Sequence, residues 1–162
     1  MISILLVHAL MSVPAATPVF ESKYTSTGLE ACKGREGDED SPGEPATDCP
    51  GLGRYEVTEN YAAVSIWHAI TSRDRPEFSL SLLPQAGLGD NVSSGKIEWR
   101  LHGGQPFAVI HRVKSCDSEV RTRCKEFLMV RGLRGHEGIT ADVDASKPDA
   151  NATARKIADD GF

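Results

Sequence analysis

The sequence predicts an α+β protein: a single antiparallel β-meander, sandwich-like in its packing, with one C-terminal α-helix. Three observations predict it. After Tyr55, apolar and polar residues alternate with the period of strands that bury one face. The C-terminal segment instead repeats apolar residues with the period of a helix. The 162-residue chain shows no internal repeat, and without its first 16 residues it has the size of one domain.

The first segment predicts export. Residues 1–16 contain no Lys, Arg, Asp or Glu, are almost wholly apolar up to Val13, and end in Pro14-Ala15-Ala16. An apolar core followed by small residues is typical of a cleaved secretory signal peptide, and it is too short to remain as a membrane span. We expect a signal peptide over 1–16, an exported domain over 17–162, and a periplasmic or secreted location. A buried N-terminal strand or short helix is the alternative.

An acidic segment rich in Gly and Pro over residues 34–50 predicts a solvent-exposed loop, because it lacks apolar periodicity. Cys32 and Cys49 lie at its two ends, where a disulfide would close the loop at its base. Asp38 and Asp40 suggest a calcium loop, but position twelve from Asp38 is Cys49 and not the Glu that an EF-hand needs. We expect a plain acidic loop.

The alternation of apolar and polar residues predicts five to seven strands, which follow one another along the chain as a meander. The clearest segments are 64–70, 78–82, 97–102, 107–113, 127–133 and 139–143. Gly103-Gly104 supplies the positive φ angles of a tight hairpin turn, and Pro106 opens the return strand.

Export would place the four cysteines in a compartment where disulfides persist. Cys116 and Cys124 lie just beyond the facing ends of strands 107–113 and 127–133, as a pair that closes a long hairpin would. Four cysteines allow three pairings. We expect Cys32–Cys49 and Cys116–Cys124, because each pair joins the ends of a local loop.

The C-terminal helix has a start signal, an apolar face and a stop signal. Ser146 is the expected N-cap, with Pro148 near the first helical position. Gly161 can end the helix in the left-handed conformation. The residues that share the apolar face are Ala150, Ala154, Ile157 and Ala158.

Residues with reactive side chains form no recognisable motif. The four histidines of the mature chain lack metal-ligand spacing, and no G-x-S-x-G sequence indicates a nucleophilic serine. His68 and His111 share strand faces with apolar residues, which predicts positions at the core edge, whereas His102 beside the turn should be exposed. We therefore assign no catalytic residue, no metal site and no cofactor.

Several short motifs are spread over most of the mature chain: Tyr24-Thr25-Ser26, Cys49-Pro50-Gly51, Glu98-Trp99-Arg100-Leu101, and the blocks 106–110, 148–152 and 154–159. In these motifs the chain resembles a family of small, uncharacterised, cysteine-containing exported proteins of Gram-negative bacteria. The resemblance implies export, a bacterial source and the fold. It gives no information about catalytic activity.

Charge is spread unevenly along the chain, which has a net charge of −5. Residues 36–60 carry eight acids against Arg54, and residues 96–134 carry nine bases against four acids. An anionic partner such as an envelope component is one interpretation, and mutual contact or solvation of the two regions is the other. The overall acidity argues against a nucleic-acid partner.

We expect a non-enzymatic periplasmic or secreted binding or structural module. The alternative is a small hydrolase or enzyme inhibitor with its site on the polar face of the hairpin over 98–113. Arg100 and His102 share that face, and Arg112 on the return strand could lie near them and help to hold an anionic ligand. The ordinary solvated face of an antiparallel sheet would show the same residues.

Overall fold

The computed structural model describes residues 18–34, 47–62, 65–85, 87, 89–120 and 122–162. The predicted signal peptide and residues 35–46 of the predicted acidic loop lie outside the described residues.

The described chain forms a ten-stranded sheet and one helix. The elements are β1 (Phe20–Ser26), β2 (Lys33–Gly34), β3 (Thr47–Leu52), β4 (Tyr55–Ala62), β5 (Ser65–Ser72), β6 (Arg75–Leu82), β7 (Gly89–His102), β8 (Gln105–Asp117), β9 (Cys124–Gly132), β10 (Thr140–Asp144) and α1 (Ala150–Asp160). The α+β class is confirmed. The expected meander of five to seven antiparallel strands is wrong in detail, because β5 and β7 pair in parallel at Ile66 and Val92.

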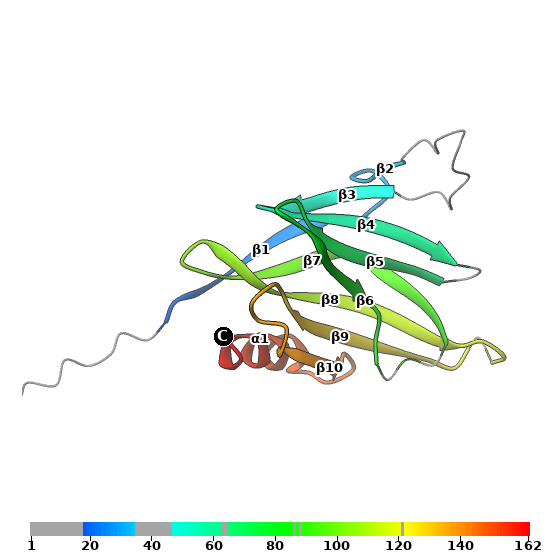
Figure 1. The fold of residues 1–162 in the computed structure, drawn as a ribbon. Helices are drawn as coiled ribbons and strands as arrows, with labels where there is room; N and C mark the ends of the chain where they lie inside the picture. Colours follow the sequence, from blue (N-terminus) through cyan, green and yellow to red (C-terminus); the bar gives the residue numbers. More distant parts are fainter. Residues whose placement is uncertain (1–17, 35–46, 63–64, 86, 88, 121) are drawn as a thin grey trace, which may run out of the picture.

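The sheet divides into two lobes at this parallel contact (Figure 1). β6 covers only the C-terminal half of one edge of β5, so β7 meets the remaining end of that edge. β7 then continues beside β1. The result is a first lobe of β2 to β6 and a second lobe of β1 and β7 to β10, which curls over the first.

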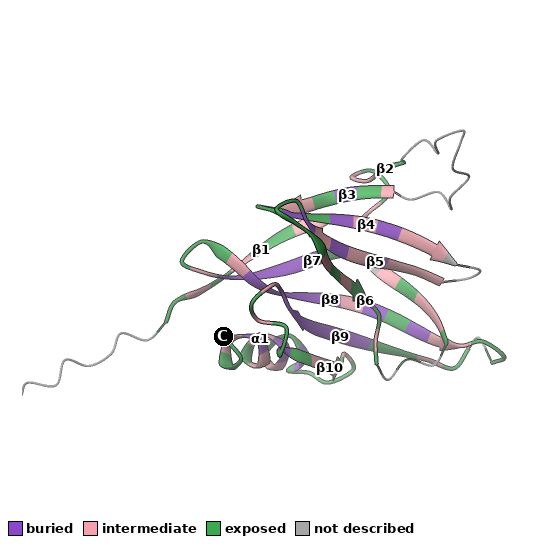
Figure 2. Ribbon diagram, in the orientation of Figure 1, coloured by how far each residue is buried: buried purple, intermediate pink, exposed green. Residues whose placement is uncertain are grey.

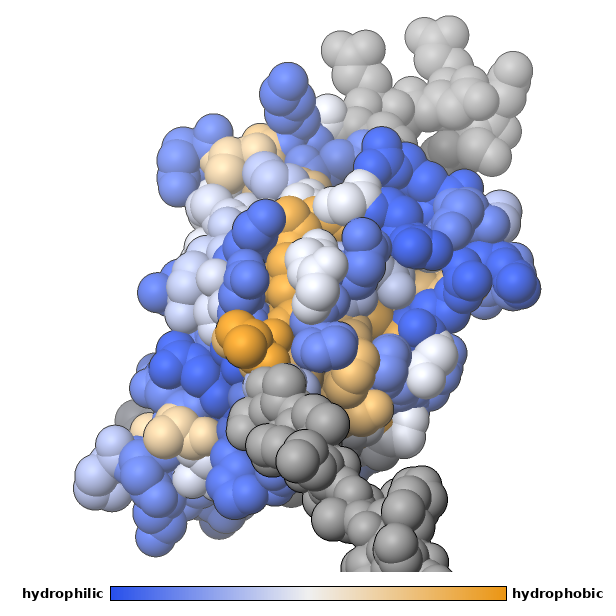
Figure 3. Space-filling view, turned by 90° about the vertical axis from the view of Figure 1, so that its left-hand side faces the viewer, coloured by the Kyte–Doolittle hydropathy of each residue, from blue (hydrophilic) through white to orange (hydrophobic). Residues whose placement is uncertain are grey.

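Within the second lobe, the parts of β7, β8 and β9 that are purple in Figure 2 are buried on both faces. Its inner face packs Trp99, Val109 and Met129 against Ile70 and other apolar residues of the first lobe. Its outer face packs against α1, whose small Ala150, Ala154 and Ala158 are buried there. The predicted apolar face of the helix is therefore confirmed for the three alanines, and Ile157 packs against the same core but is only partly buried. At the end of the sheet on the left of Figure 1, apolar side chains reach the surface in a band between hydrophilic ones (Figure 3).

The hairpin and both disulfides are confirmed. Gly103 and Gly104 have φ of 56° and 77° between β7 and β8. Cys116 lies directly opposite Cys124 in the β8–β9 ladder, and the two are bonded. Cys32 is bonded to Cys49, and this bridge holds β2 beside β3. At both ends of the predicted loop, Gly34 and residues 47–50 therefore belong to paired strands.

Both predicted helix signals are wrong. The helix begins after Asp149 rather than Ser146, whose hydroxyl donates to Asp144 at 2.6 Å. Gly161 stays right-handed at φ −88°. A Cβ at that position would lie 2.7 Å from Cγ1 of Ile139, so glycine permits close packing here and not a left-handed turn.

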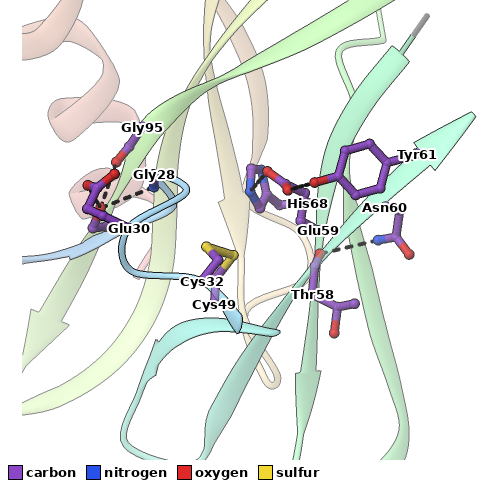
Figure 4. Close-up of a disulfide and its surroundings, with 11 residues drawn as sticks. Gly28, Glu30, Cys32, Cys49, Thr58, Glu59, Asn60, Tyr61, His68 and Gly95 are labelled. Atoms are coloured by element: carbon purple, nitrogen blue, oxygen red, sulfur yellow. Dashed lines mark hydrogen bonds and ion pairs between the residues drawn. A yellow bond between two sulfur atoms is a disulfide. The ribbon is translucent and has the colours of Figure 1, made fainter. Parts of the chain in front are cut away.

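His68 and His111 lie deep in the core and not at its edge. Each is 1% exposed, and their rings meet edge to face between the two lobes, with centroids 5.2 Å apart. Nε2 of His68 is 3.4 Å from Oε2 of Glu59, whose other carboxylate oxygen, Oε1, accepts the Tyr61 hydroxyl (Figure 4). Burial lowers the pKa of His68 to about 4 and that of His111 to about 3, so both imidazoles are neutral at pH 7.

This buried pair predicts loss of stability in mild acid. An unfolded histidine takes up a proton near pH 6.5, whereas the folded pair resists protonation down to about pH 4 and about pH 3. Between pH 6.5 and 4 the unfolding free energy should therefore fall as pH falls, by about 1.4 kcal/mol per pH unit for each histidine. Urea unfolding at pH 7, 6 and 5 measures this slope. His68→Gln should roughly halve it, and a variant with the full wild-type slope would contradict the assignment.

Candidate ligand-binding site

The candidate site begins at an irregularity in β7. Ser93 lies opposite Val113 of β8, but Ile97 lies opposite His111. Between these two pairs β7 therefore contains two more residues than β8, which makes a β-bulge. Two hydrogen bonds hold the extra residues in place. Nδ1 of His111 donates to the Lys96 carbonyl at 2.9 Å, since a carbonyl can only accept, and the Thr27 amide donates to the Gly95 carbonyl at 3.0 Å. Such bulges re-aim the side chains beside them.

A cavity of about 580 Å³ lies on the outer face of the second lobe, between this bulge and the first turn of α1. Its volume is within the usual range for small-molecule sites. The residues that line it are Tyr24, Gly95, Lys96, Glu98, Ile110, Arg112, Leu128 and Asn151. The cavity therefore combines an apolar base from β8 and β9 with charged residues and a tyrosine at its sides.

Two cations border the apolar base. The ammonium of Lys96 lies 5.1 Å from the centre of the Tyr24 ring, and no ion pair joins Lys96 to a carboxylate of the described chain. Arg112 pairs with Glu126 at 3.1 Å, but both side chains are more than a third exposed. Exposed ion pairs contribute little free energy. Both cations are therefore available to an anionic ligand.

Glu98 lies at the helix side of the cavity, and α1 neutralises it. Arg155 donates to both carboxylate oxygens, at 2.7 and 3.2 Å, and the Ser22 hydroxyl donates at 2.6 Å. Burial acts to raise the pKa of Glu98, but the hydrogen bonds from Arg155 and Ser22 outweigh it and hold this pKa below its usual value. Glu98 is thus a paired anion and does not cancel the charge of Lys96.

The three sequence-predicted ligand residues are not brought together. Arg100 is buried under α1 and donates to both carboxylate oxygens of Asp159, at 2.9 and 2.6 Å. His102 lies at the hairpin end, 4.4 Å from the Phe162 ring, and is half-buried instead of exposed. Of the three, only Arg112 lines the cavity.

Sequence reasoning missed Tyr24 and Lys96. Lys96 shares the strand parity of Glu98 and Arg100, which was a usable signal for the face it occupies. Tyr24 had no such signal, because β1 reaches this face only by pairing with β7, which places Tyr24 opposite Glu98.

Comparison with known proteins adds no family to these observations. No protein-family model, curated protein or solved structure matches the chain. Within the described ranges, no helix has the length and apolar character needed to span a membrane.

The ion pair beneath α1 yields a stability prediction with a matched control. Asp159→Ala should lower the unfolding free energy by about 3 kcal/mol, because it leaves the Arg100 charge buried without its partner. Asp160→Ala removes a neighbouring carboxylate whose pair with Lys156 is well exposed, and should change stability by less than about 0.5 kcal/mol. Denaturant unfolding of both variants measures this. Equal losses of unfolding free energy in the two variants would show that the buried ion pair does not anchor the helix.

Proposed function

We propose that this protein is an exported, non-enzymatic binding module whose ligand occupies the cavity between the β7 bulge and α1. The observation that carries the proposal is the Lys96 ammonium, which forms no ion pair among the described residues and lines the same cavity as Arg112, Ile110 and Leu128. A ligand that fits this arrangement has an anionic head and an apolar body. An anionic component of the bacterial envelope has that chemistry.

The contacts of the cavity residues support ligand binding more than catalysis. Arg100, one of the three residues expected in a hydrolase or inhibitor site, and its strand neighbour Glu98 are both engaged in ion pairs with α1. These pairs hold the helix on the sheet. The alternative of a hydrolase or inhibitor on this face therefore receives less support than a binding site.

Export is supported by the two disulfides, which persist in oxidising compartments, and by the signal-like residues 1–16. We propose a periplasmic or secreted location, as the resemblance to exported Gram-negative proteins also implies.

Octanoate is a suitable probe of the cavity, with octanamide as its neutral analogue. Titration calorimetry should show that octanoate binds and that Lys96→Met and Arg112→Met each weaken its affinity about tenfold, since a charge-assisted contact contributes 1.4 kcal/mol or more. Lys114→Met removes an exposed cation from the same strand as Arg112 but outside the cavity, and should leave the affinity unchanged. Equal binding of octanamide, or an equal effect of Lys114→Met, would refute the proposal.

Export is tested separately by N-terminal sequencing. Protein recovered from the envelope fraction of a Gram-negative host should begin near Ala16 or Thr17, because a signal peptidase cleaves after small residues. Full-length protein that begins at Met1 in the cytoplasmic fraction would contradict it.

A further inference from the structure

A second cavity, of about 370 Å³, lies at the end of the sheet where several turns meet. The β3–β4 turn, the β7–β8 turn, the loop after β9 and the C-terminal residue all lie at this end (Figure 1). It shares no lining residue with the first cavity. Its lining includes Arg54, Arg134, His102, His136, Phe107 and Phe162.

Two arginines of this cavity share one carboxylate. Nη1 of Arg54 and Nη1 of Arg134 both donate to Oδ2 of Asp74, at 2.9 and 3.2 Å. The other carboxylate oxygen accepts the Ser72 hydroxyl at 2.5 Å. The two arginines and Asp74 together therefore carry a net charge of +1. A guanidinium has five N–H donors, so each arginine retains donors for a second anion.

Aromatic rings also line this cavity. The Phe162 ring lies 4.8 Å from that of Phe107 and 5.0 Å from that of His136, with which it is stacked at 15°. Despite these contacts Phe162 remains 48% exposed. This end of the molecule is the one that shows an apolar band between hydrophilic side chains (Figure 3). A planar ligand can therefore reach the Phe162 ring from solvent, whereas Phe107 is buried beneath it.

From this juxtaposition we propose that the second cavity binds an aromatic ring that carries a carboxylate. The ring stacks against Phe162 and His136, which pack on the buried Phe107, and the carboxylate accepts hydrogen bonds from Arg54 and Arg134. Guanidinium groups match a carboxylate with two parallel N–H donors, and aromatic side chains favour offset or edge contacts with a planar ligand. The cavity volume suits a ligand of this size.

A free aromatic acid and the C-terminal Phe of a peptide both present this chemistry. The probes are therefore 3-phenylpropionate and the tripeptide Gly-Gly-Phe, each compared with its neutral amide. Binding is followed by titration NMR on the full mature chain. The acid should bind at least fivefold more tightly than its amide and should shift resonances of His102 and Phe162. Preference for the tripeptide over 3-phenylpropionate would assign the site to chain termini, and the reverse order to free acids.

Three variants decide the role of the arginines. Arg134→Gln should weaken 3-phenylpropionate binding at least fivefold, whereas Arg75→Gln, at an exposed pair with Glu77 outside the cavity, should not. Asp74→Asn removes the shared carboxylate and should tighten binding at least threefold, a gain that structural damage cannot produce. Equal affinity for acid and amide, or weaker binding by Asp74→Asn, would overturn the proposal.

Discussion

The burial of the central parts of β7, β8 and β9 on both faces is the constraint on which the rest of the structure depends. A strand covered on one side can leave its other side chains in water, but these three strands are covered by the first lobe and by α1. Their apolar residues therefore form two separate cores. The inner core joins the lobes through contacts such as Tyr55 with Trp99, whose rings are 6.1 Å apart.

Covering the second face buries charge, and this explains the role of the helix. Glu98 and Arg100 alternate with Trp99, so when Trp99 enters the inner core they must lie under α1. A buried charge without a partner is costly. Arg155 and Asp159, one helical turn apart, each supply the opposite charge through two hydrogen bonds. The alanines allow close approach of the helix, and the ion pairs set its position along the sheet.

The same architecture places the two cavities at its irregular points. The first forms where β7 bulges, and His111 holds the bulge from within the core by its hydrogen bond to the Lys96 carbonyl. The second forms at the end of the lobes, where glycines with positive φ at positions 53, 103, 104 and 135 turn the chain. Both cavities have cations beside apolar surface, although the chain as a whole is acidic.

The sequence by itself determined the coarse class, the Gly103-Gly104 hairpin, both disulfides and the alanine face of the helix, because each depends on local periodicity, turn chemistry or loop closure. Only the tertiary structure decided the parallel β5–β7 contact, the deep burial of His68 and His111, and the pairing of Arg100 with Asp159. Residues 59 positions apart meet in that pair, and no local pattern encodes such a meeting. Of the residues predicted to bind one ligand, Arg112 lines the first cavity and His102 the second, whereas Arg100 is held in its ion pair with Asp159. Strand alternation correctly assigns a residue to a face, whereas the packing of the helix decides which charges on that face remain free.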